Sequence, residues 1–401
     1  MRRHLLLALI ISSCVLFFRL GSNQLQSWDE AIYAESAKEM LITGDYLTPR
    51  WNQEKFFQKP PLAMWATASL FKLFGVNETA ARAFSALCGV GCVLLTMLIG
   101  RLFLSESLSF IAGLILLVTP HFNYHARQGG LDVPLIFFML LALYGFLKAQ
   151  VDSRWWILFG IGAALAIMTK GPGAAPLFVA VGITLVLRPS QFWKSGRFWM
   201  GVGILFILGS AWHLGMIYLY GNEFLREYLG QQILARAARV VDTTPHGWLF
   251  YVRTLFFGLL PYTFLLPFAI AQIWKTREFP TVLTIFSITV FVICTTVVTK
   301  QAWYILPVYP VLALAFASLN ASLSRVFLPL FLVAMVHCII LDRQIPLLNP
   351  EQPAIISKAQ TGTGPFETDI RYAPAVLFYS NRKICTLAPD HTMGQMTKCS
   401  N

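Results

Sequence analysis

Long apolar blocks alternate with short polar segments along the chain. The blocks are about 15 to 25 residues long, which suits helices that cross the hydrocarbon core of a bilayer. They comprise residues 5–20, 81–104, 107–122, 131–149, 154–169, 172–188, 198–220, 249–273, 280–299, 302–319 and 324–341. The pattern therefore predicts an all-α integral membrane protein with about eleven transmembrane helices.

The first apolar block follows Arg2, Arg3 and His4. A basic start before an apolar run is also typical of a signal peptide, but no A-x-A cleavage site follows. We therefore interpret residues 5–20 as a retained first helix. Cleavage would leave the topology of the remaining chain unchanged.

Residues 21–80 form a long first loop with two helical patterns of its own. Between Trp28 and Met40 apolar and charged residues alternate as in a helix that lies in the membrane interface. Residues 61–74 are apolar but short, so they form either an interfacial helix or a span.

The distribution of basic residues orients the predicted helices. With a cytoplasmic N-terminus, the inside segments carry Arg2, Arg3, Lys148, Arg154, Arg188, Lys194, Arg197, Lys275, Arg277 and Arg325. Counting 61–74 as a span would move the later cations outside, so we favour the interfacial interpretation. The predicted organisation is a transmembrane unit, 1–341, with extracytoplasmic loops at 21–80 and 221–248, and a small extracytoplasmic tail at 342–401.

Composition supports a membrane protein. The chain is 56% hydrophobic and 12% charged, whereas soluble domains average about 25% charged residues. Soluble globular and nucleic-acid-binding proteins are therefore excluded, and the net charge of +12 fits cytoplasmic anchoring plus a site for an anionic lipid. Of seven cysteines, Cys385 and Cys399 lie in the polar tail and could form a disulfide there.

Three acids stand where apolar helices begin. Asp29 and Glu30 follow the first helix, and Asp132 opens the block 131–149. Ionisable groups at a membrane surface are costly unless they are solvated or used, so each is a functional candidate. The structural alternative is that Asp29 and Asp132 cap their helices.

Several cations fall on the same predicted side as these acids. Lys59 precedes a double proline, Lys170 lies in a Gly-Pro turn, and Lys300 lies between two apolar blocks. Arg127 precedes Asp132, and Arg236 lies in the 221–248 loop, which could instead hold a partly solvated amphipathic helix. Cations can hold a phosphate and a carboxylate can take a proton, so the set suits group transfer from a phosphate-linked carrier. Because the sequence has no Walker-type or G-x-G-x-x-G loop, a lipid phosphate is expected rather than a soluble nucleotide.

These motifs resemble the GT-C superfamily of lipid-linked glycosyltransferases, of the family 39 type. That type includes protein O-mannosyltransferases and the bacterial lipid A aminoarabinose transferases. The matching segments are SWDEAIYAESAKEMLITGDYLTPRWNQEKFFQKPPLAMW, ARQGGLDVPLIFF, MTKGPGAAP and TKQAWYILPVYPVLAL. They cover most of residues 1–320 in the order expected for the family.

The resemblance implies an inverting transferase in the bacterial cytoplasmic (inner) membrane, with its active site on the extracytoplasmic side. Its donor would be a polyprenyl (undecaprenyl) phosphate sugar, and its acceptor lipid A, another glycolipid, a glycan or a protein. Asp29 would activate the acceptor hydroxyl, Asp132 would support it, and Glu30 would join the acidic cluster. Lys59 and Tyr33 would lie near the donor phosphate, together with Lys170, Arg127, Lys300 and Arg236.

Two positions depart from the aminoarabinose transferases. Those enzymes usually carry an Arg where this chain has Ile32, and an acid where it has Gln58. The second change removes a potential metal ligand, so we predict no metal site and assign no cofactor. A monomer surrounded by membrane lipids, with no nucleic-acid partner, is expected. A transporter or flippase of an anionic lipid-linked substrate and a non-catalytic scaffold are the alternative functions.

Overall fold

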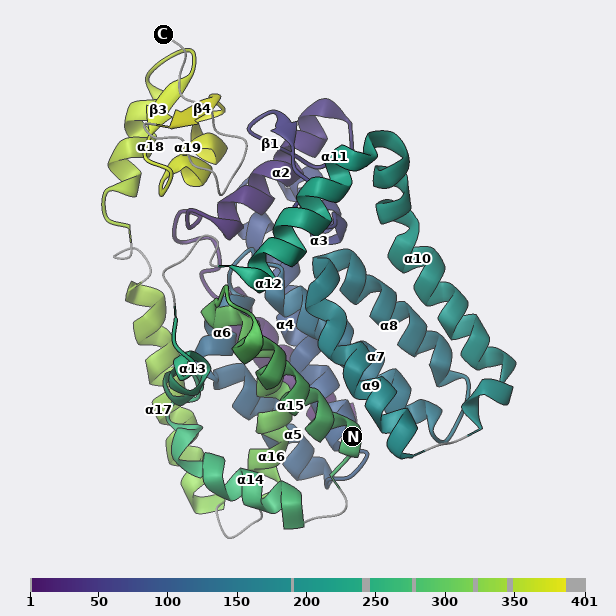
Figure 1. Ribbon diagram of the computed structural model, residues 1–401. Helices are drawn as coiled ribbons and strands as arrows, with labels where there is room; N and C mark the ends of the chain where they lie inside the picture. Colours follow the sequence, from purple (N-terminus) through teal and green to yellow (C-terminus); the bar gives the residue numbers. More distant parts are fainter. Residues whose placement is uncertain are drawn as a thin grey trace.

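The computed structural model describes residues 2–188, 191–239, 246–275, 279–319, 324–344 and 349–386 of the chain. Arg277 and Cys399 lie outside these ranges. The N-terminal half contains α1 Arg2–Phe17, α2 Asp29–Thr43, β1 Arg50–Trp51, β2 Glu54–Lys55, α3 Leu62–Phe74, α4 Glu78–Gly100, α5 Glu106–Val118, α6 Pro120–Ala126, α7 Asp132–Ala149, α8 Trp155–Lys170, η1 Gly171–Ala174, α9 Ala175–Leu187, η2 Phe192–Lys194 and α10 Gly196–Tyr220. Helices dominate this half, as the apolar blocks predicted (Figure 1).

The second half continues the helical pattern and ends in a small mixed unit. Its elements are α11 Asn222–Leu225, η3 Arg226–Ala235, α12 Arg236–Ala238, α13 Phe250–Gly258, η4 Tyr262–Leu265, α14 Leu266–Lys275, α15 Thr281–Thr296, η5 Ala302–Val308, α16 Tyr309–Ala317, α17 Ser324–Gln344, α18 Gln352–Gln360, β3 Phe366–Thr368, α19 Ala373–Ser380 and β4 Ile384–Thr386. The strands form two separate pairs, β1 antiparallel to β2 and β3 parallel to β4.

The helices fit a multi-pass membrane protein, but the predicted number of eleven spans is not confirmed. Among the described residues, four helical segments are long and apolar enough to cross a membrane, or up to six if each of two bent pairs is one span. These four are Glu78–Gly100, Asp132–Ala149, Trp155–Leu187 and Gly196–Tyr220. The segment 61–74 is the short helix α3, 13 residues long; at about 1.5 Å per residue it is shorter than a bilayer core is thick.

Two predicted spans are bent because each contains a proline. The block 107–122 is divided into α5 and α6, which meet at 70°. Thr119 takes an extended conformation before Pro120, since proline disfavours a helical residue in front of it. The block 249–273 is likewise divided at Pro261, where its two helical parts meet at 112°. Proline removes a helical N–H donor, which explains the second break.

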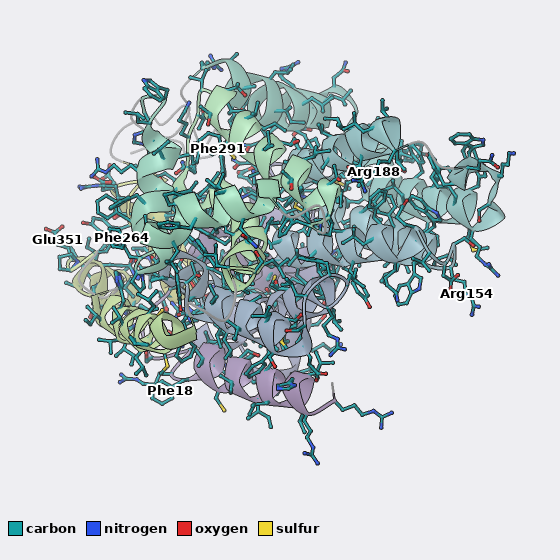
Figure 2. All side chains as sticks on the ribbon, turned by 90° about the horizontal axis from the view of Figure 1, so that it is seen from below. Phe18, Arg154, Arg188, Phe264, Phe291 and Glu351 are labelled. Carbon is teal, nitrogen blue, oxygen red and sulfur yellow. The ribbon has the colours of Figure 1, made fainter. Side chains whose placement is uncertain are left out.

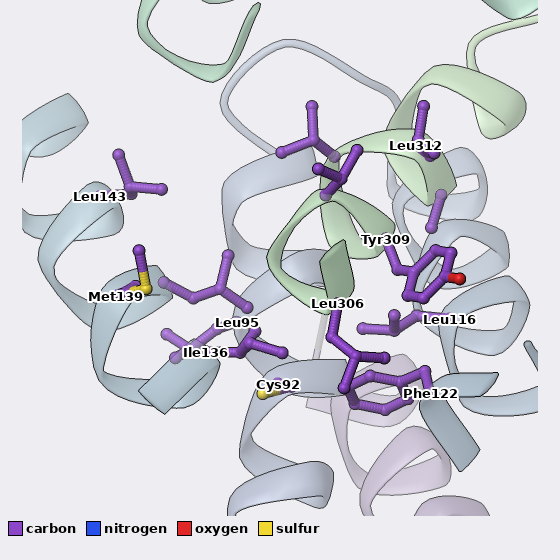
Figure 3. Close-up of a cluster of buried hydrophobic side chains, with 14 of the residues drawn as sticks. Cys92, Leu95, Leu116, Phe122, Ile136, Met139, Leu143, Leu306, Tyr309 and Leu312 are labelled. Carbon is purple, nitrogen blue, oxygen red and sulfur yellow. The ribbon is translucent and has the colours of Figure 1, made fainter. Parts of the chain in front are cut away.

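The main core lies between α4, α5, α7 and α16. Cys92 and Leu95 of α4 face Ile136 and Met139 of α7 (Figure 3). Leu116, Leu306 and Tyr309 complete the cluster from α5, η5 and α16. Close packing of these apolar side chains holds α7 in place against α4, and therefore determines the position of Asp132 in its first turn.

Helices α8 and α10 approach each other through glycines. A Cβ atom added at Gly160 would overlap the backbone oxygen of Gly201, and one added at Gly201 would overlap that of Trp156. Small residues permit such close backbone contact between membrane helices. This contact holds α8, and with it Lys170, against a long helix whose outer face is apolar and exposed.

Gly201→Val is expected to lower the free energy of unfolding by about 1–3 kcal/mol, because the added side chain must push against backbone. The measurement is the thermal midpoint of the purified protein in detergent. Gly203→Val is the matched control on the same helix, since a Cβ there meets nothing within 4 Å. An equal loss in both variants would contradict the importance of the α8–α10 contact.

Helix α2 exists as predicted, but protein surrounds it. Every residue from Glu30 to Met40 is buried. One side packs on α3, and another packs on α19 of the C-terminal unit, 349–386, which lies at the top of Figure 1. The Lys38 ammonium lies 2.6 Å from Glu35 and donates to the Phe378 carbonyl at 2.7 Å. The alternation of apolar and charged residues therefore reflects buried ion pairs as well as any contact with lipid.

The C-terminal unit is an ordered small fold that closes over the first loop. Asn52 exchanges two hydrogen bonds with the Ile384 backbone, each 2.9 Å long. The Tyr379 hydroxyl binds Glu78 and accepts from the Leu25 N–H, both at 2.8 Å. Cys385 is disulfide-bonded. The predicted boundary at 341 falls within α17, which continues to Gln344.

Candidate active site

Six separate segments bring ionisable side chains together at one end of the helix bundle. They are the first turn of α2, the extended segment before α3, the start of α7, the end of α8, the start of α12, and η5. The residues that these segments supply are Asp29, Tyr33, Lys59, Asp132, Lys170, Arg236 and Tyr304. Most of these residues lie at or near the ends of helices, so their side chains meet at one end of the bundle rather than at its middle.

Asp132 and Lys170 form the central ion pair. Their charged atoms are 2.6 Å apart, and their side chains are only 13% and 11% exposed. The Lys170 ammonium also lies 5.2 Å from the centre of the Tyr304 ring, a cation–π contact. Asp132 therefore has its negative charge matched within the protein, which makes it a positioning partner for Lys170.

Lys59 contributes a second cation from the segment before the double proline. Its ammonium donates to the Gln232 side-chain oxygen at 3.1 Å. Burial, followed by the charges of Arg236 and Lys170, lowers the pKa of Lys59 to about 7, although Asp29 and Asp132 act in the opposite direction. An anion bound beside Lys59 would therefore relieve crowding among three cations.

Arg236 adds the third cation from the 221–248 loop. This loop is helical from Asn222 to Ala238, with a π-helix at η3, as the structural alternative of a helix predicts. π-Helical segments are frequent at functional sites. The Arg236 guanidinium lies 3.5 Å from the Tyr304 hydroxyl. Gln232 and Arg236, four residues apart, thus place one contact on Lys59 and one on Tyr304.

Asp29 is the carboxylate of the set that could accept a proton, because Asp132 is already paired with Lys170. Within the described ranges its side chain has no hydrogen-bond or ion-pair partner, and it is half-buried. Trp28 before it has a positive φ of 78°, an unusual conformation for a large side chain. Burial, Asp29 and Asp132 all raise the pKa of the Tyr33 hydroxyl, which keeps Tyr33 a neutral hydrogen-bond donor beside the two acids.

Three residues of the sequence-based site lie in other surroundings. Glu30 forms a buried ion pair with Arg82, at 2.8 Å, and is not part of the open cluster. Arg127 donates to the carbonyls of Val15 and Phe18, near the end of α1. Lys300 donates to the Val297 carbonyl at 2.7 Å. Geometry favours structural roles for Glu30 and Arg127, and it leaves the role of Lys300 in phosphate binding a prediction.

Two members of the site, Tyr304 and Gln232, are not predicted from the sequence. Tyr304 lies four residues after Lys300, in a motif that was recognised for its lysine alone. Gln232 precedes Arg236 by one helical turn, and an amide in a polar loop carries no signal of its own. Both owe their positions to the folding of distant segments around Lys59 and Lys170.

The described residues contain no group of three or more His, Cys, Asp and Glu side chains that could hold a metal ion. Gln58 offers only a neutral amide oxygen. The donor set beside Asp29 and Asp132 is dominated by Lys59, Lys170 and Arg236. These three cations could bind an anion, and no step is assigned to a metal.

Comparison with known proteins shows what this chain is similar to. Residues 58–215 match the family model of dolichyl-phosphate-mannose-protein mannosyltransferase. The crystal structure of ArnT from Cupriavidus metallidurans bound to undecaprenyl phosphate has a TM-score of 0.83 and 20% identity, and covers 97% of this chain and 86% of that chain. The chain has the GT-C fold of that structure. The resemblance indicated by the motifs is therefore confirmed.

Two relatives extend the comparison of this GT-C chain. An uncharacterized protein of Aquifex aeolicus (strain VF5) is 32% identical over 332 residues, which is 81% of this chain and 65% of that protein. Undecaprenyl phosphate-alpha-4-amino-4-deoxy-L-arabinose arabinosyl transferase 2 of Pseudomonas fluorescens (strain Pf0-1) is 29% identical over 273 residues, 65% of this chain and 48% of that protein. The chain thus spans about half to two thirds of the length of these relatives.

Proposed function

We propose that this GT-C chain is an inverting glycosyltransferase that moves a sugar from a polyprenyl-phosphate carrier to an acceptor hydroxyl. The observation that carries the proposal is the Asp29 carboxylate beside Lys59, Lys170 and Arg236, which has no hydrogen-bond or ion-pair partner among the described residues. The Pseudomonas fluorescens relative is named as a transferase for an undecaprenyl-phosphate-linked sugar, and the structural neighbour contains undecaprenyl phosphate. The three cations of this set can bind the phosphate of a donor, and the Asp29 carboxylate can act as a proton-accepting base.

Each group has one task in the proposed reaction. Asp29 takes the proton of the acceptor hydroxyl as its oxygen bonds to the anomeric carbon of the sugar. The bond from that carbon to the phosphate oxygen breaks on the opposite face, so the configuration inverts. Lys59 and Arg236 stabilise the charge that collects on the departing polyprenyl phosphate. Asp132 keeps the Lys170 ammonium fixed toward the Tyr304 ring and the phosphate site.

We place the protein in the bacterial inner membrane, with the site on the extracytoplasmic side. The basic residues Lys148, Arg154 and Arg188 at the opposite end of the bundle support this orientation. The acceptor is a hydroxyl of lipid A, another glycolipid, a glycan or a protein. A polyprenyl-phosphate donor would spread its tail along the exposed apolar helices while its phosphate reached Lys59.

The test is to reconstitute the purified protein in liposomes with polyprenyl-phosphate sugars. Mass spectrometry of lipids and proteins should detect a glycosylated acceptor and free polyprenyl phosphate in equal amounts. Comparing envelope lipids and glycoproteins with and without the gene would identify the sugar and acceptor. Movement of the intact donor across the bilayer with no chemical product would instead establish a transporter or flippase and overturn the proposal.

Donor use should weaken as pH rises, because Lys59 binds an anion only when protonated. With a pKa of about 7, kcat/KM for the donor should fall about tenfold per pH unit above about pH 8. The phosphodiester stays anionic throughout this range. In Lys59→Arg the cation persists, so the decline should move beyond pH 9. Parallel pH profiles for the two proteins would contradict this role of Lys59.

A further inference from the structure

A cavity lies at the end of the bundle away from Asp29. It has a volume of about 220 Å³ and lies between the end of α7, the end of α9 and the start of α15. Its walls are formed by Phe146, Leu147, Gln150, Thr184, Leu185, Arg188, Pro280, Thr281 and Val282. Helix α7 has 18 residues; at about 1.5 Å per residue, the cavity is about 27 Å from Asp132, close to the thickness of a bilayer core.

The polar groups of this cavity are suited to an anion. Arg188 is exposed, and within the described chain its guanidinium has no partner; Figure 2 labels it in the view from this end. The Thr281 hydroxyl likewise has none among the described residues. Helix α15, 16 residues long, begins there after Pro280 without a side-chain cap. The Leu283 N–H donates to the Pro280 carbonyl, so within the described chain the N–H groups of Thr281 and Val282 and the positive end of the helix dipole remain available. Among the described residues, no acid lines the cavity.

Apolar surface continues from the cavity toward the middle of the bundle. Val179, Ile183 and Val186 of α9 are exposed at spacings of four and three residues, so they share one face. The neighbouring helix α15, which packs along α9, exposes Ile288 and Val292. A charged opening joined to two apolar helix faces matches a molecule with an anionic head and a hydrocarbon chain.

We propose that this cavity binds the phosphate headgroup of an anionic membrane phospholipid, with an acyl chain lying along α9 and α15. Basic pockets between membrane helices recognise such headgroups. The described part of the chain places no carboxylate base in the wall of the cavity. Bound lipid would tie α9 to α15 at this end of the bundle. The site is independent of the proposed transfer reaction, which takes place at the other ends of these helices.

The test compares lipid retention by native mass spectrometry. Detergent-purified protein is mixed with equal amounts of phosphatidylglycerol and phosphatidylcholine. The wild type should retain phosphatidylglycerol preferentially, and Arg188→Gln should lose about fivefold of that preference. Arg188→Lys should keep most of it. Arg154→Gln is the matched control, since Arg154 is an exposed arginine at the same end that does not line the cavity; it should behave as the wild type.

Two further measurements distinguish binding in this cavity from nonspecific electrostatic binding of an anionic lipid. Leu185→Trp, which fills the cavity and keeps Arg188, should also lose phosphatidylglycerol while the variant retains its thermal midpoint. Glycerophosphoglycerol, the same head without acyl chains, should not compete. Equal losses in Arg154→Gln and Arg188→Gln, full retention in Leu185→Trp, or effective competition by the soluble head would each overturn the proposal. Sugar transfer by Arg188→Gln should equal that of the wild type.

Discussion

Asp29→Asn is expected to slow sugar transfer by about 10²–10⁴-fold, the usual contribution of a general base, while the protein stays folded in the membrane. Asparagine keeps the size of the side chain but cannot accept the acceptor's proton. The carboxylate has no partner within the described residues, so its removal leaves no cation stranded. The measurement is the single-turnover rate with saturating polyprenyl-phosphate sugar, beside the thermal midpoint of the purified variant.

Asp152→Asn serves as the matched control for the charge change. Asp152 precedes α8, at the end of the bundle away from Asp29, and among the described residues its carboxylate interacts only with the Arg154 backbone N–H and side chain. Its transfer rate should equal that of the wild type. Donor binding by Asp29→Asn should also remain close to normal, because Lys59 and Arg236 are untouched. Transfer at more than a tenth of the wild-type rate in Asp29→Asn would assign the base elsewhere.

The sequence predicted those features that depend on short segments of the chain. Hydrophobic length marked each major helical block, since a bilayer requires about 20 apolar residues per helix. Ionisable residues at the borders of those blocks, such as Asp132 and Lys170, were informative because burying a charge is costly without a partner. Their pairing at 2.6 Å is the arrangement that makes both positions tolerable.

Contacts between segments that are distant in the chain could not be predicted from the sequence. The bends at Pro120 and Pro261 change two predicted spans, and a proline by itself does not reveal whether neighbouring helices accommodate a kink. The C-terminal unit reads as polar, yet Tyr379 and the Phe378 carbonyl bind the first loop and α2. Such contacts join residues more than 300 positions apart, and no local pattern records them.

Asp29 and Glu30 show where local reasoning ends. They are adjacent acids in the first turn of one helix, and the sequence treated them as one cluster. In the structure, Glu30 accepts two hydrogen bonds from Arg82, at 2.8 and 3.1 Å, and others from the Gly129 and Gln26 N–H groups. Consecutive helical residues point about 100° apart, so one acid faces the cations of the site and its neighbour faces α4.

Glu30→Gln should therefore be chiefly a stability variant, with a loss of about 3–5 kcal/mol in the free energy of unfolding. The substitution leaves the Arg82 guanidinium buried without its counter-charge, since the two side chains are only 6% and 4% exposed. Arg82 also donates to the carbonyls of Leu20 and Asn23, so the damage should spread to the connection between α1 and α2. The thermal midpoint in detergent and the yield of folded protein measure the effect.

The exposed Glu54→Gln is the control for Glu30→Gln and should change stability by no more than about 0.5 kcal/mol. Adding Arg82→Met to Glu30→Gln should recover part of the loss, because the uncompensated charge is then gone, although the carbonyls that Arg82 bound stay unsatisfied. The fraction of Glu30→Gln that folds should transfer sugar within about tenfold of the wild-type rate per molecule. A fully stable Glu30→Gln protein with the rate of Asp29→Asn would instead move Glu30 into the chemistry.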